Sequence, residues 1–247
     1  MGNSNVQAHY PRHRAMRRVL QRFSHLAFAT LTDLRITGQE NLPAGGPLIV
    51  VANHFSYVDA AALVRVAPWP LEFLVGHRMP YAPVWGTWVP KLWGPLIVYR
   101  GTVSLGALRV AEATLMQGGV VGTFPEGGNW ATVLRPARPG VAFLAVRTGA
   151  RILPIGLDGL LDFFPSLRRG RRARVTCRIG EPFGPFHATG RGRTRRRQLD
   201  EIGDEIMRHI AALLPPERRG LYSDDAAIRA AAAEVERFPW DDAPEYL

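Results

Sequence analysis

The sequence predicts an α/β fold in which a mainly parallel sheet is flanked by helices, with an amphipathic helix at the N-terminus and further helices at the C-terminus. Short apolar runs rich in Val, Ile and Leu, typical of strands buried on both faces, alternate with segments of helical periodicity. A polar turn joins most of these runs to the helix that follows, as in the repeating unit of a parallel sheet. Hydrophobic residues make up 47% of the 247 residues, which is enough for a sizeable core.

An amphipathic helix is predicted from residue 14 to residue 32. Apolar side chains recur there at steps of three and four residues, at Met16, Val19, Leu20, Phe23, Ala27 and Leu31. Arginines lie largely on its other faces. Such a helix is typical either of a segment lying flat in a membrane interface or of one that packs on a core with a solvated basic face. Both interpretations stay open, and we treat residues 1–33 as an N-terminal segment.

Five apolar runs along the rest of the chain are predicted as strands: 48–52, 96–99, 120–124, 152–156 and 175–179. Helices are predicted over 60–66, 105–117, 141–148, 199–213 and 223–237. No shift in composition marks a linker, so we expect one domain. Its core comprises residues 34–190, and residues 191–247 form a helical segment of the same domain.

The net charge of +10 is carried almost wholly by arginine, because Lys91 is the only lysine. Nucleic acid, anionic lipid headgroups and phosphorylated small molecules all fit such a surface. Arginine clusters at 168–174 and 191–197 suit the first two, although no helix-turn-helix, zinc-finger or stacking-sheet motif supports nucleic acid. Cys177 is the only cysteine, which excludes an intrachain disulfide and a metal site of the cysteine type. No apolar run reaches the roughly 20 residues of a membrane span.

The best candidate for chemistry follows the first buried strand, where Asp59 comes five residues after His54. A histidine in a loop at the carboxyl end of a strand can act as a base near neutral pH. Asp59, placed where the next helix begins, can turn back, accept the imidazole Nδ1–H and leave Nε2 to take a proton from an alcohol. The alternative is a helix-capping aspartate beside an ordinary hydrogen-bonded histidine, which is the commoner case for an isolated pair.

Other polar residues follow the later predicted strands. Arg100 can bind phosphate through its fork of donors. Glu126 can bind a substrate hydroxyl or hold Arg100, and Gly127 beside it allows a ligand to approach the backbone closely. Pro154 is unusual because it interrupts an apolar run otherwise typical of a central strand. The Trp-containing stretch 71–93 is typical either of a lining for an acyl chain or a membrane contact, or of core packing.

These strand ends form four ordered blocks: His54-x4-Asp59, Arg100-Gly101, Phe124-Pro125-Glu126-Gly127 and Leu153-Pro154-Ile155. In this order they resemble the glycerolipid acyltransferase family typified by 1-acylglycerol-3-phosphate acyltransferase, over a region from about Leu34 to Gly159. The resemblance implies direct transfer of a fatty acyl group from acyl-CoA or acyl-carrier protein to a hydroxyl of a lysophospholipid or related lipid acceptor.

The resemblance also implies a role for each matched residue. These roles are general base for His54, orienting partner for Asp59, acceptor or phosphate binding for Arg100, Glu126, Gly127 and Asn129, and acyl-site wall for Pro154. No metal and no bound cofactor are implied, because the acyl thioester is a co-substrate.

Two positions depart from the family's pattern. After Phe-Pro-Glu-Gly the family commonly continues with Thr or Ser and then Arg, whereas here Gly128 and Asn129 are followed by Trp130. The basic residue that commonly follows near a glycine is also absent, so Arg135 or Arg138 stands in for it. These departures leave the identity of the acceptor open.

The expected partners are a lipid acceptor, an acyl-CoA or acyl-carrier protein donor and an anionic membrane surface, and nucleic acid is not expected. The expected location is the cytoplasm, with the protein peripheral on the inner face of the cell membrane. The competing interpretation is a non-catalytic basic protein that binds membranes or nucleic acid. The intact pair of His54 and Asp59 argues against a third interpretation, a catalytically inactive scaffold of the same fold.

Overall fold

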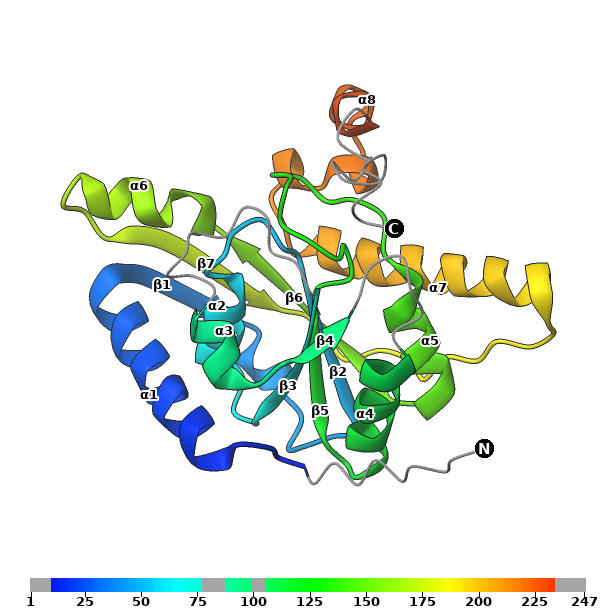
Figure 1. The fold of residues 1–247 in the computed structure, drawn as a ribbon. Coiled ribbons are helices and arrows are strands. Elements are labelled where there is room, and N and C mark those ends of the chain that lie inside the picture. The colour runs from blue at the N-terminus through cyan, green and yellow to red at the C-terminus, as the bar shows by residue number, and fades with distance from the viewer. Residues whose placement is uncertain (1–9, 77–87, 99–104, 234–247) are drawn as a thin grey trace, which may run out of the picture.

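A single sheet organises the computed structural model, which describes residues 10–76, 88–98 and 105–233. Its strands are β1 (Thr32–Thr37), β2 (Leu48–Ala52), β3 (Leu71–Gly76), β4 (Leu96–Val98), β5 (Val120–Thr123), β6 (Arg151–Asp158) and β7 (Ala173–Ile179). They lie in the order β1-β7-β6-β2-β5-β3-β4 (Figure 1). Only the β6–β7 pair is antiparallel among these strands, so the predicted mainly parallel sheet is confirmed.

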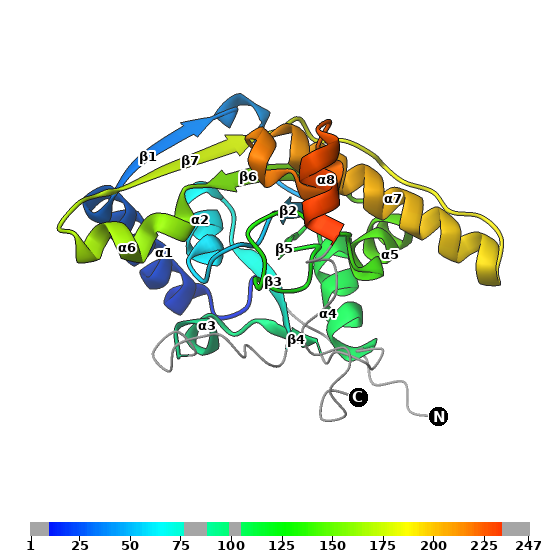
Figure 2. The same cartoon turned by 90° about the horizontal axis from the view of Figure 1, so that it is seen from above.

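Helices cover both faces of this sheet. They are α1 (Arg14–Leu31), α2 (Asp59–Val66), α3 (Trp88–Trp93), α4 (Leu105–Met116), α5 (Pro139–Thr148), α6 (Phe163–Arg168), α7 (Gly192–Ala212) and α8 (Ala226–Ala233). Figures 1 and 2 show α1, α2 and α6 on one face and α4, α5 and α7 on the other. Within the described ranges, none of the helices combines the length and apolar character that crossing a membrane requires.

Strand β2 shows why an unbroken apolar run marks a strand in this fold. Leu48, Val50 and Ala52 pack into the core beneath α1 and α2. Ile49 and Val51 point the other way, into the core beneath α4, α5 and α7. Because successive side chains of a strand alternate between faces and both faces are covered, every residue of β2 is buried.

The sequence analysis missed the elements whose apolar pattern is weak or short. β1 is an edge strand in which inward and outward residues alternate, and α6 is only six residues long. β3 lies within the stretch 71–93, where Leu71, Phe73 and Trp93 are buried and therefore belong to the core. Trp85 lies outside the described residues. The segment boundary expected after residue 33 falls inside β1, and the one after residue 190 falls just before α7.

Helix α7 begins at Gly192, earlier than the predicted start at Leu199. The apolar stripe that signalled the helix starts only where α7 meets the sheet, since its first buried residue is Ile202. The preceding turns are rich in exposed arginine and extend the helix beyond its packed part (Figure 1). The apolar pattern therefore predicted the half of α7 that packs on the sheet, but not the residue at which the helix begins.

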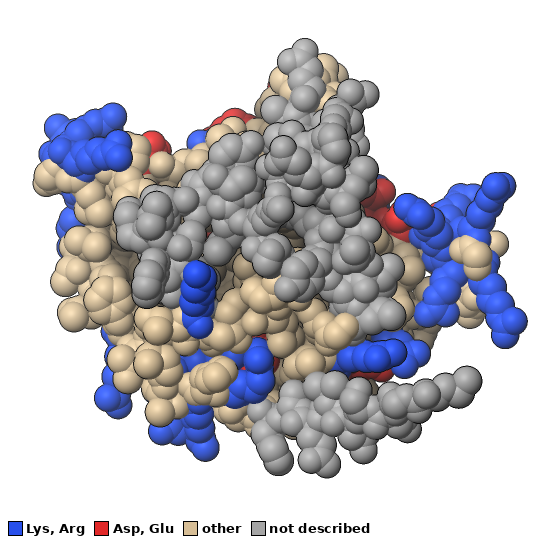
Figure 3. Space-filling model, viewed as in Figure 1, with Lys and Arg blue, Asp and Glu red and all other residues tan. Residues whose placement is uncertain are grey.

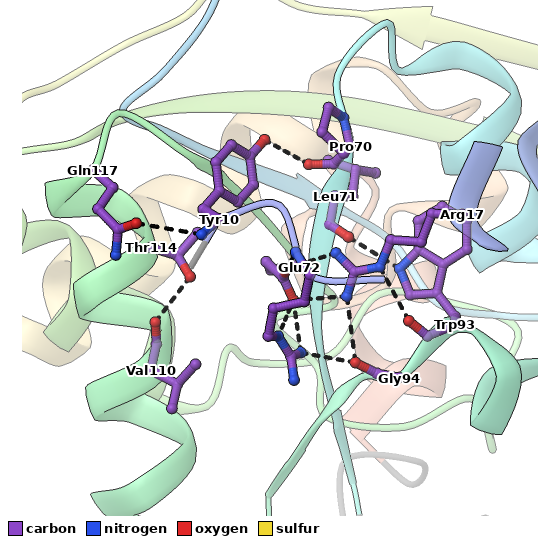
Figure 4. A network of polar contacts seen from close by, with 11 residues as sticks. Tyr10, Arg17, Pro70, Leu71, Glu72, Trp93, Gly94, Val110, Thr114 and Gln117 are labelled. Carbon is purple, nitrogen blue, oxygen red and sulfur yellow. Dashed lines mark hydrogen bonds and ion pairs between the residues drawn. The ribbon is translucent and has the colours of Figure 1, made fainter. Parts of the chain in front are cut away.

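A buried ion-pair network fastens α1 to β3, the strand next to the edge of the sheet (Figure 4). Arg17, 2% exposed, donates to both carboxylate oxygens of Glu72 on β3 at 2.5 and 2.9 Å, and Arg12 donates to Glu72 Oε2 at 2.7 Å. Burial favours the neutral carboxyl, but the two guanidiniums outweigh it and lower the pKa of Glu72. Both arginines also donate to Gly94 O, and Arg17 Nε donates to Trp93 O, so the network ties α1 to the end of α3 as well.

Polar contacts continue along the inner face of α1. Gln21 Nε2 donates to the Ala67 carbonyl at 2.9 Å, and Ser24 Oγ donates to the Ala61 carbonyl at 2.8 Å. Phe28 is the one fully buried apolar side chain that α1 contributes to the core. The helix is therefore held largely by hydrogen bonds and ion pairs rather than by an apolar inner face.

Candidate active site

Two loops meet at the carboxyl edge of the sheet because β2 and β5 are adjacent parallel strands. The loop after β2 carries residues 53–58, and the loop after β5 carries residues 124–138. Parallel neighbours end at the same edge, which is where α/β proteins gather their ligands. Residues that are far apart in the sequence, such as His54 and Glu126, are brought into contact in this way.

Asn53 fixes the start of the first loop. Its side-chain amide donates to the Leu157 carbonyl at 2.8 Å, and its Oδ1 accepts the Leu157 N–H at 2.7 Å. This fully buried side chain thus extends the pairing of β2 with β6 by one step after β2 has ended. The residue that follows, His54, leaves the sheet from a fixed position.

Asp59 organises the loop and the imidazole together. Its Oδ2 atom lies 2.9 Å from His54 Nδ1 and accepts the backbone N–H groups of Phe55 and Ser56, both at 2.7 Å. Asp59 is also the first residue of α2, where a carboxylate interacts favourably with the helix dipole. Asp59 therefore contacts the histidine and the loop before α2, whereas the N-cap position of the helix is Val58 and no side-chain cap bond forms there.

The imidazole of His54 is held in one orientation by this contact. Its proton is assigned to Nδ1, since an ionised Asp59, 1% exposed, can only accept. No described residue hydrogen-bonds Nε2, and the His54 side chain is 19% exposed. A histidine in this state can take a proton from a bound hydroxyl.

An aromatic stack supports the ring of His54. The ring of Phe124, from the loop after β5, lies 4.1 Å from it between centroids at an interplanar angle of 17°. Phe73 of β3 stacks on Phe124 in turn, with centroids 6.4 Å apart. One side of the imidazole is thus closed by apolar surface, which restrains its rotation and keeps water from that side.

Glu126 holds the main chain of His54. Its Oε1 atom accepts the His54 backbone N–H at 2.8 Å, while Oε2 accepts Nε and Nη2 of Arg135 at 3.3 and 3.2 Å. The carboxylate has no exposed surface, and burial raises its pKa to about 7 despite the opposing charge of Arg135. Glu126 is therefore buried against the His54 backbone and is not exposed to a substrate.

Arg135 completes this pair from the far end of the same loop. It is 2% exposed, its Nη2 also donates to the Gly128 carbonyl at 2.5 Å, and its guanidinium carbon lies 3.2 Å from the ring centroid of Trp130. Burial lowers the pKa of Arg135. Its Nη1 atom finds no hydrogen-bond acceptor within the described part of the chain. Of the two arginines expected to stand in as the family's basic residue, this one is directed inward.

Three further residues were predicted to bind the acceptor: Arg100, Gly127 and Asn129. Arg100 lies outside the described residues. Gly127 adopts φ +79°, a conformation that favours glycine, and its N–H donates to Phe124 O at 3.0 Å. Asn129 is half-buried in the loop two residues further on. The roles assigned to these residues stay predictions.

Pro154 is buried within β6, on the face of the sheet that α7 covers. A Cβ atom built on Gly180 would come within 2.8 Å of its Cγ and 3.2 Å of Leu213, which follows α7. The antiparallel ladder between β6 and β7 begins only at Ile155, so the missing N–H of Pro154 costs no hydrogen bond on that side. This explains a proline in a central strand, and its place in an acyl-site wall stays a prediction.

The fold and this geometry define an α/β protein with a His–Asp pair at the carboxyl edge of a parallel sheet. The family model described as "Acyltransferase" matches residues 33–158, just over half of the 247 residues. The chain belongs to this acyltransferase family, and its relatives support the resemblance to glycerolipid acyltransferases.

Relatives of known name agree with the family. A 1-acyl-sn-glycerol-3-phosphate acyltransferase of Borreliella burgdorferi is 28% identical over 135 residues, covering 52% of this chain and 52% of that protein. One from Chlamydomonas reinhardtii is 26% identical over 221 residues, covering 85% of this chain and 63% of the relative. The chain thus spans between half and two thirds of the length of these relatives.

The fold also has a solved counterpart. The crystal structure of the 1-acyl-sn-glycerophosphate acyltransferase PlsC from Thermotoga maritima superposes with a TM-score of 0.54 at 24% identity, covering 80% of this chain and 81% of that one. The predicted fold class, a glycerolipid acyltransferase-like sheet with helices at both ends of the chain, is confirmed.

Sequence reasoning missed two features of the site. Nothing in the sequence indicated the stack of His54 on Phe124, except that Phe124 lies in the same block as Glu126. The contact from Glu126 to the His54 backbone was also missed, because a partner 72 residues away leaves no local pattern. Arg135 was noticed only as an alternative to Arg138, and no sequence pattern indicated which of them faces inward.

Proposed function

We propose that the protein is an O-acyltransferase that moves a fatty acyl group from acyl-CoA or acyl-carrier protein to a hydroxyl of a lysophospholipid or related lipid. The observation that carries this proposal is the contact of 2.9 Å between His54 Nδ1 and Asp59 Oδ2, at the carboxyl edge of the sheet and on a histidine whose side chain is 19% exposed. Membership of the acyltransferase family supplies the reaction class.

In this mechanism the acceptor hydroxyl binds beside His54 Nε2. The imidazole takes the proton as the oxygen attacks the thioester carbonyl, forming a C–O bond, and Asp59 stabilises the imidazolium. The C–S bond then breaks, and the imidazolium returns its proton to the departing thiolate. Proton and electron pairs balance without a covalent acyl-enzyme.

The developing oxyanion needs hydrogen-bond donors, and we expect backbone N–H groups of one of the glycine turns to supply them. The Gly127 N–H already donates to Phe124 O, so it is engaged within the turn itself. The acceptor's polar head is assigned to Arg100 and Asn129, in the roles that the family resemblance implies for them. Because Asn129 replaces an arginine of the family pattern, we leave open whether this head carries a phosphate.

The outer surface of α1 supports docking on an anionic membrane. Val19, Phe23 and Leu26 are 61%, 67% and 63% exposed, and they lie on the side of the helix away from the polar contacts of Arg17 and Ser24. A helix that uses its polar side for the protein core and leaves its apolar side in solvent needs another apolar phase to cover that side. The lipid interface supplies one.

Basic residues flank this apolar stripe. Arg14, Arg18 and Arg22 are exposed along α1, and each contributes about 1 kcal/mol near an anionic bilayer. Further basic side chains gather over the start of α7 and over the turn between α6 and β7, at opposite sides of the view in Figure 3. We propose a peripheral position on the inner, cytoplasmic face of the cell membrane, where both the donor and an anionic surface are available.

The experiment that tests the function is acyl transfer from labelled acyl-CoA and acyl-carrier protein to a panel of lysolipids and other lipid alcohols. We expect product from the wild type and a loss of at least about 1,000-fold in His54→Ala, since His54 is the proposed base. Exposed His187→Ala is the matched control and should keep wild-type activity.

Two outcomes would contradict this proposal in different ways. A covalent acyl-enzyme released by hydroxylamine would exclude the direct mechanism while keeping the acyltransferase. A folded wild type that makes no product with any acceptor would favour the non-catalytic membrane-binding alternative.

A further inference from the structure

We propose that Arg135 is a positioning residue for the acyl-transfer reaction, acting on His54 through the buried carboxylate of Glu126. The inference rests on the proposed function for its kinetic consequence, but the positioning itself stands on contacts within the chain. Arg135 lies outside the four sequence blocks that resemble the family, in a chain whose arginine at the usual place is replaced by Asn129.

The contacts form a short path from Arg135 to the catalytic loop. Glu126 Oε2 receives three hydrogen bonds from Arg135, from the backbone N–H at 3.3 Å, from Nε at 3.3 Å and from Nη2 at 3.2 Å. The other oxygen, Oε1, is thereby turned toward the His54 backbone N–H at 2.8 Å. Arg135 thus sets both the orientation of the carboxylate and the face that it presents to His54.

The segment around Arg135 is also held in place by contacts that do not involve Glu126. Leu134, next to Arg135, is fully buried and donates its N–H to the Arg218 carbonyl at 3.0 Å, while Arg218 Nη1 donates to the Thr132 carbonyl. Gly220 packs so closely that an added Cβ would lie 2.2 Å from the Leu134 carbonyl oxygen. The segment that carries Arg135 is therefore held against the residues that follow α7, and it is not free to move with the rest of the loop after β5.

The charge of Arg135 is what suits Glu126 to this task. An isolated carboxylate with no exposed surface would become neutral, and a neutral carboxyl accepts a backbone hydrogen bond more weakly than an ionised one. The guanidinium opposes that neutralisation from 3.2 Å. Without the guanidinium, the hydrogen bond from the His54 backbone N–H to Glu126 weakens. The imidazole is then held less firmly against Asp59 and Phe124.

A direct contact between Arg135 and the acceptor is the competing role. Three of its contacts with protein use Nε and Nη2, and the residue is only 2% exposed. The ring of Trp130 covers one face of the guanidinium at 3.2 Å. An arginine that binds a substrate phosphate presents its fork of donors to the accessible site, whereas two of the three nitrogens of this guanidinium, Nε and Nη2, are directed at Glu126.

The first test is backbone hydrogen exchange in wild type, Arg135→Met and Arg135→Lys, which needs no enzyme activity. We expect Arg135→Met to speed exchange of the His54 amide at least about tenfold, with β2 and β6 unchanged, and Arg135→Lys to lie between the two. Arg147→Met, which removes an exposed ion pair with Glu112, is the matched control and should leave His54 exchange at the wild-type rate.

The second test is a kinetic cycle with Glu126→Gln. We expect Arg135→Met to lower kcat about tenfold, with KM for the acceptor within about twofold, because a displaced base affects the chemical step. In the Glu126→Gln background the same change should cost less than about twofold, since the path is already broken. A substrate contact would instead raise KM and would add to the effect of Glu126→Gln.

The proposal is overturned if the His54 amide exchanges at the wild-type rate in folded Arg135→Met, or if exchange rises equally throughout the core. If Arg135→Met does not fold, Arg135→Lys carries the same comparison with a smaller expected change. A wild type inactive toward every acceptor would refute the acyltransferase function but leave the exchange result to decide the positioning role.

Discussion

Glu126 is a carboxylate without exposed surface inside a protein of net charge +10. Its two oxygens are divided between the backbone of His54 and the side chain of Arg135. Burial raises its pKa from 4.5 to about 7, so the folded state binds a proton that the unfolded state has already released over this range. Its contribution to stability therefore declines as the pH rises from about 4.5 to about 7.

Replacing this carboxyl gives a signed prediction. The amide of Glu126→Gln does not titrate, so the variant lacks this pH dependence. We therefore expect the wild type to lose about 3 kcal/mol in its free energy of unfolding, relative to the variant, between about pH 4 and about pH 8. Denaturant unfolding of both proteins across this range measures the difference. A difference that grows with pH would show that Arg135 keeps the pKa of Glu126 below its usual value.

At the same scale, the sequence predicted the contact of His54 with Asp59 but only part of its surroundings. The spacing of these residues across a strand end and a helix start allowed their side chains to meet, the four ordered blocks favoured it, and they do meet at 2.9 Å. The acceptor-binding role expected for Glu126 is not favoured by its contacts, because both of its oxygens are used within the protein. Whether a loop carboxylate faces substrate or core depends on what covers it.

Helix α1 shows at the scale of an element how a helix can be attached by its polar side. Arg17 and Glu72 form a buried pair, 2% and 0% exposed, whose carboxylate is shared with Arg12. Arg17 also lies over the Trp93 ring at 5.4 Å, and Trp93 contacts Phe73 edge to face. The N-terminal helix is thereby joined to the same aromatic residues that lead, through Phe124, to His54.

Breaking this pair should loosen α1. Arg17→Met leaves Glu72 buried with one cation instead of two, and we expect a loss of about 3 kcal/mol in the free energy of unfolding, at the lower end of the range for a broken buried pair. Thermal or denaturant unfolding measures it. Arg197→Met, which removes an exposed pair on α7, should cost less than about 1 kcal/mol. Equal effects of the two changes would refute the structural role of the network.

The whole molecule is asymmetric, since exposed apolar residues cluster on α1 while the opposite face of the sheet is closed by α4, α5 and α7. Leu92 of α3 and Ile97 of β4 are also exposed, at 50% and 39%. Helix α3, which carries Leu92, lies beside α1. This side therefore offers both apolar and basic groups to a bilayer.

Membrane docking can be tested at this scale by flotation with vesicles. We expect binding to vesicles containing anionic lipid, weaker binding at high salt, and a loss of at least about tenfold in a variant carrying Phe23→Glu and Leu26→Glu. Met116→Glu is the matched control, because Met116 is 71% exposed on α4, on the other face of the sheet. Unchanged flotation of the double variant would exclude α1 as the docking surface.

Patterns among neighbouring residues predicted the parts of this protein whose structure depends mainly on the local sequence. Unbroken apolar runs identified β2 and β5 because strands covered on both faces must be apolar throughout, and helical periodicity identified α1, α4 and α5. Edge strand β1 and short helix α6 were missed because a one-sided or six-residue element carries little periodic signal. Four short blocks in order were enough to indicate the acyltransferase family.

How these parts meet depends on the packing of the whole chain. The order of strands places the loops after β2 and β5 side by side, and this adjacency lets Glu126 reach the backbone of a residue 72 positions away. It also turns Arg135 inward and leaves the apolar side of α1 outward. Burial is a property of the packed whole, and it decides whether a charged side chain becomes a ligand, a support for a neighbour or a solvated surface group, so no local pattern could have settled these assignments.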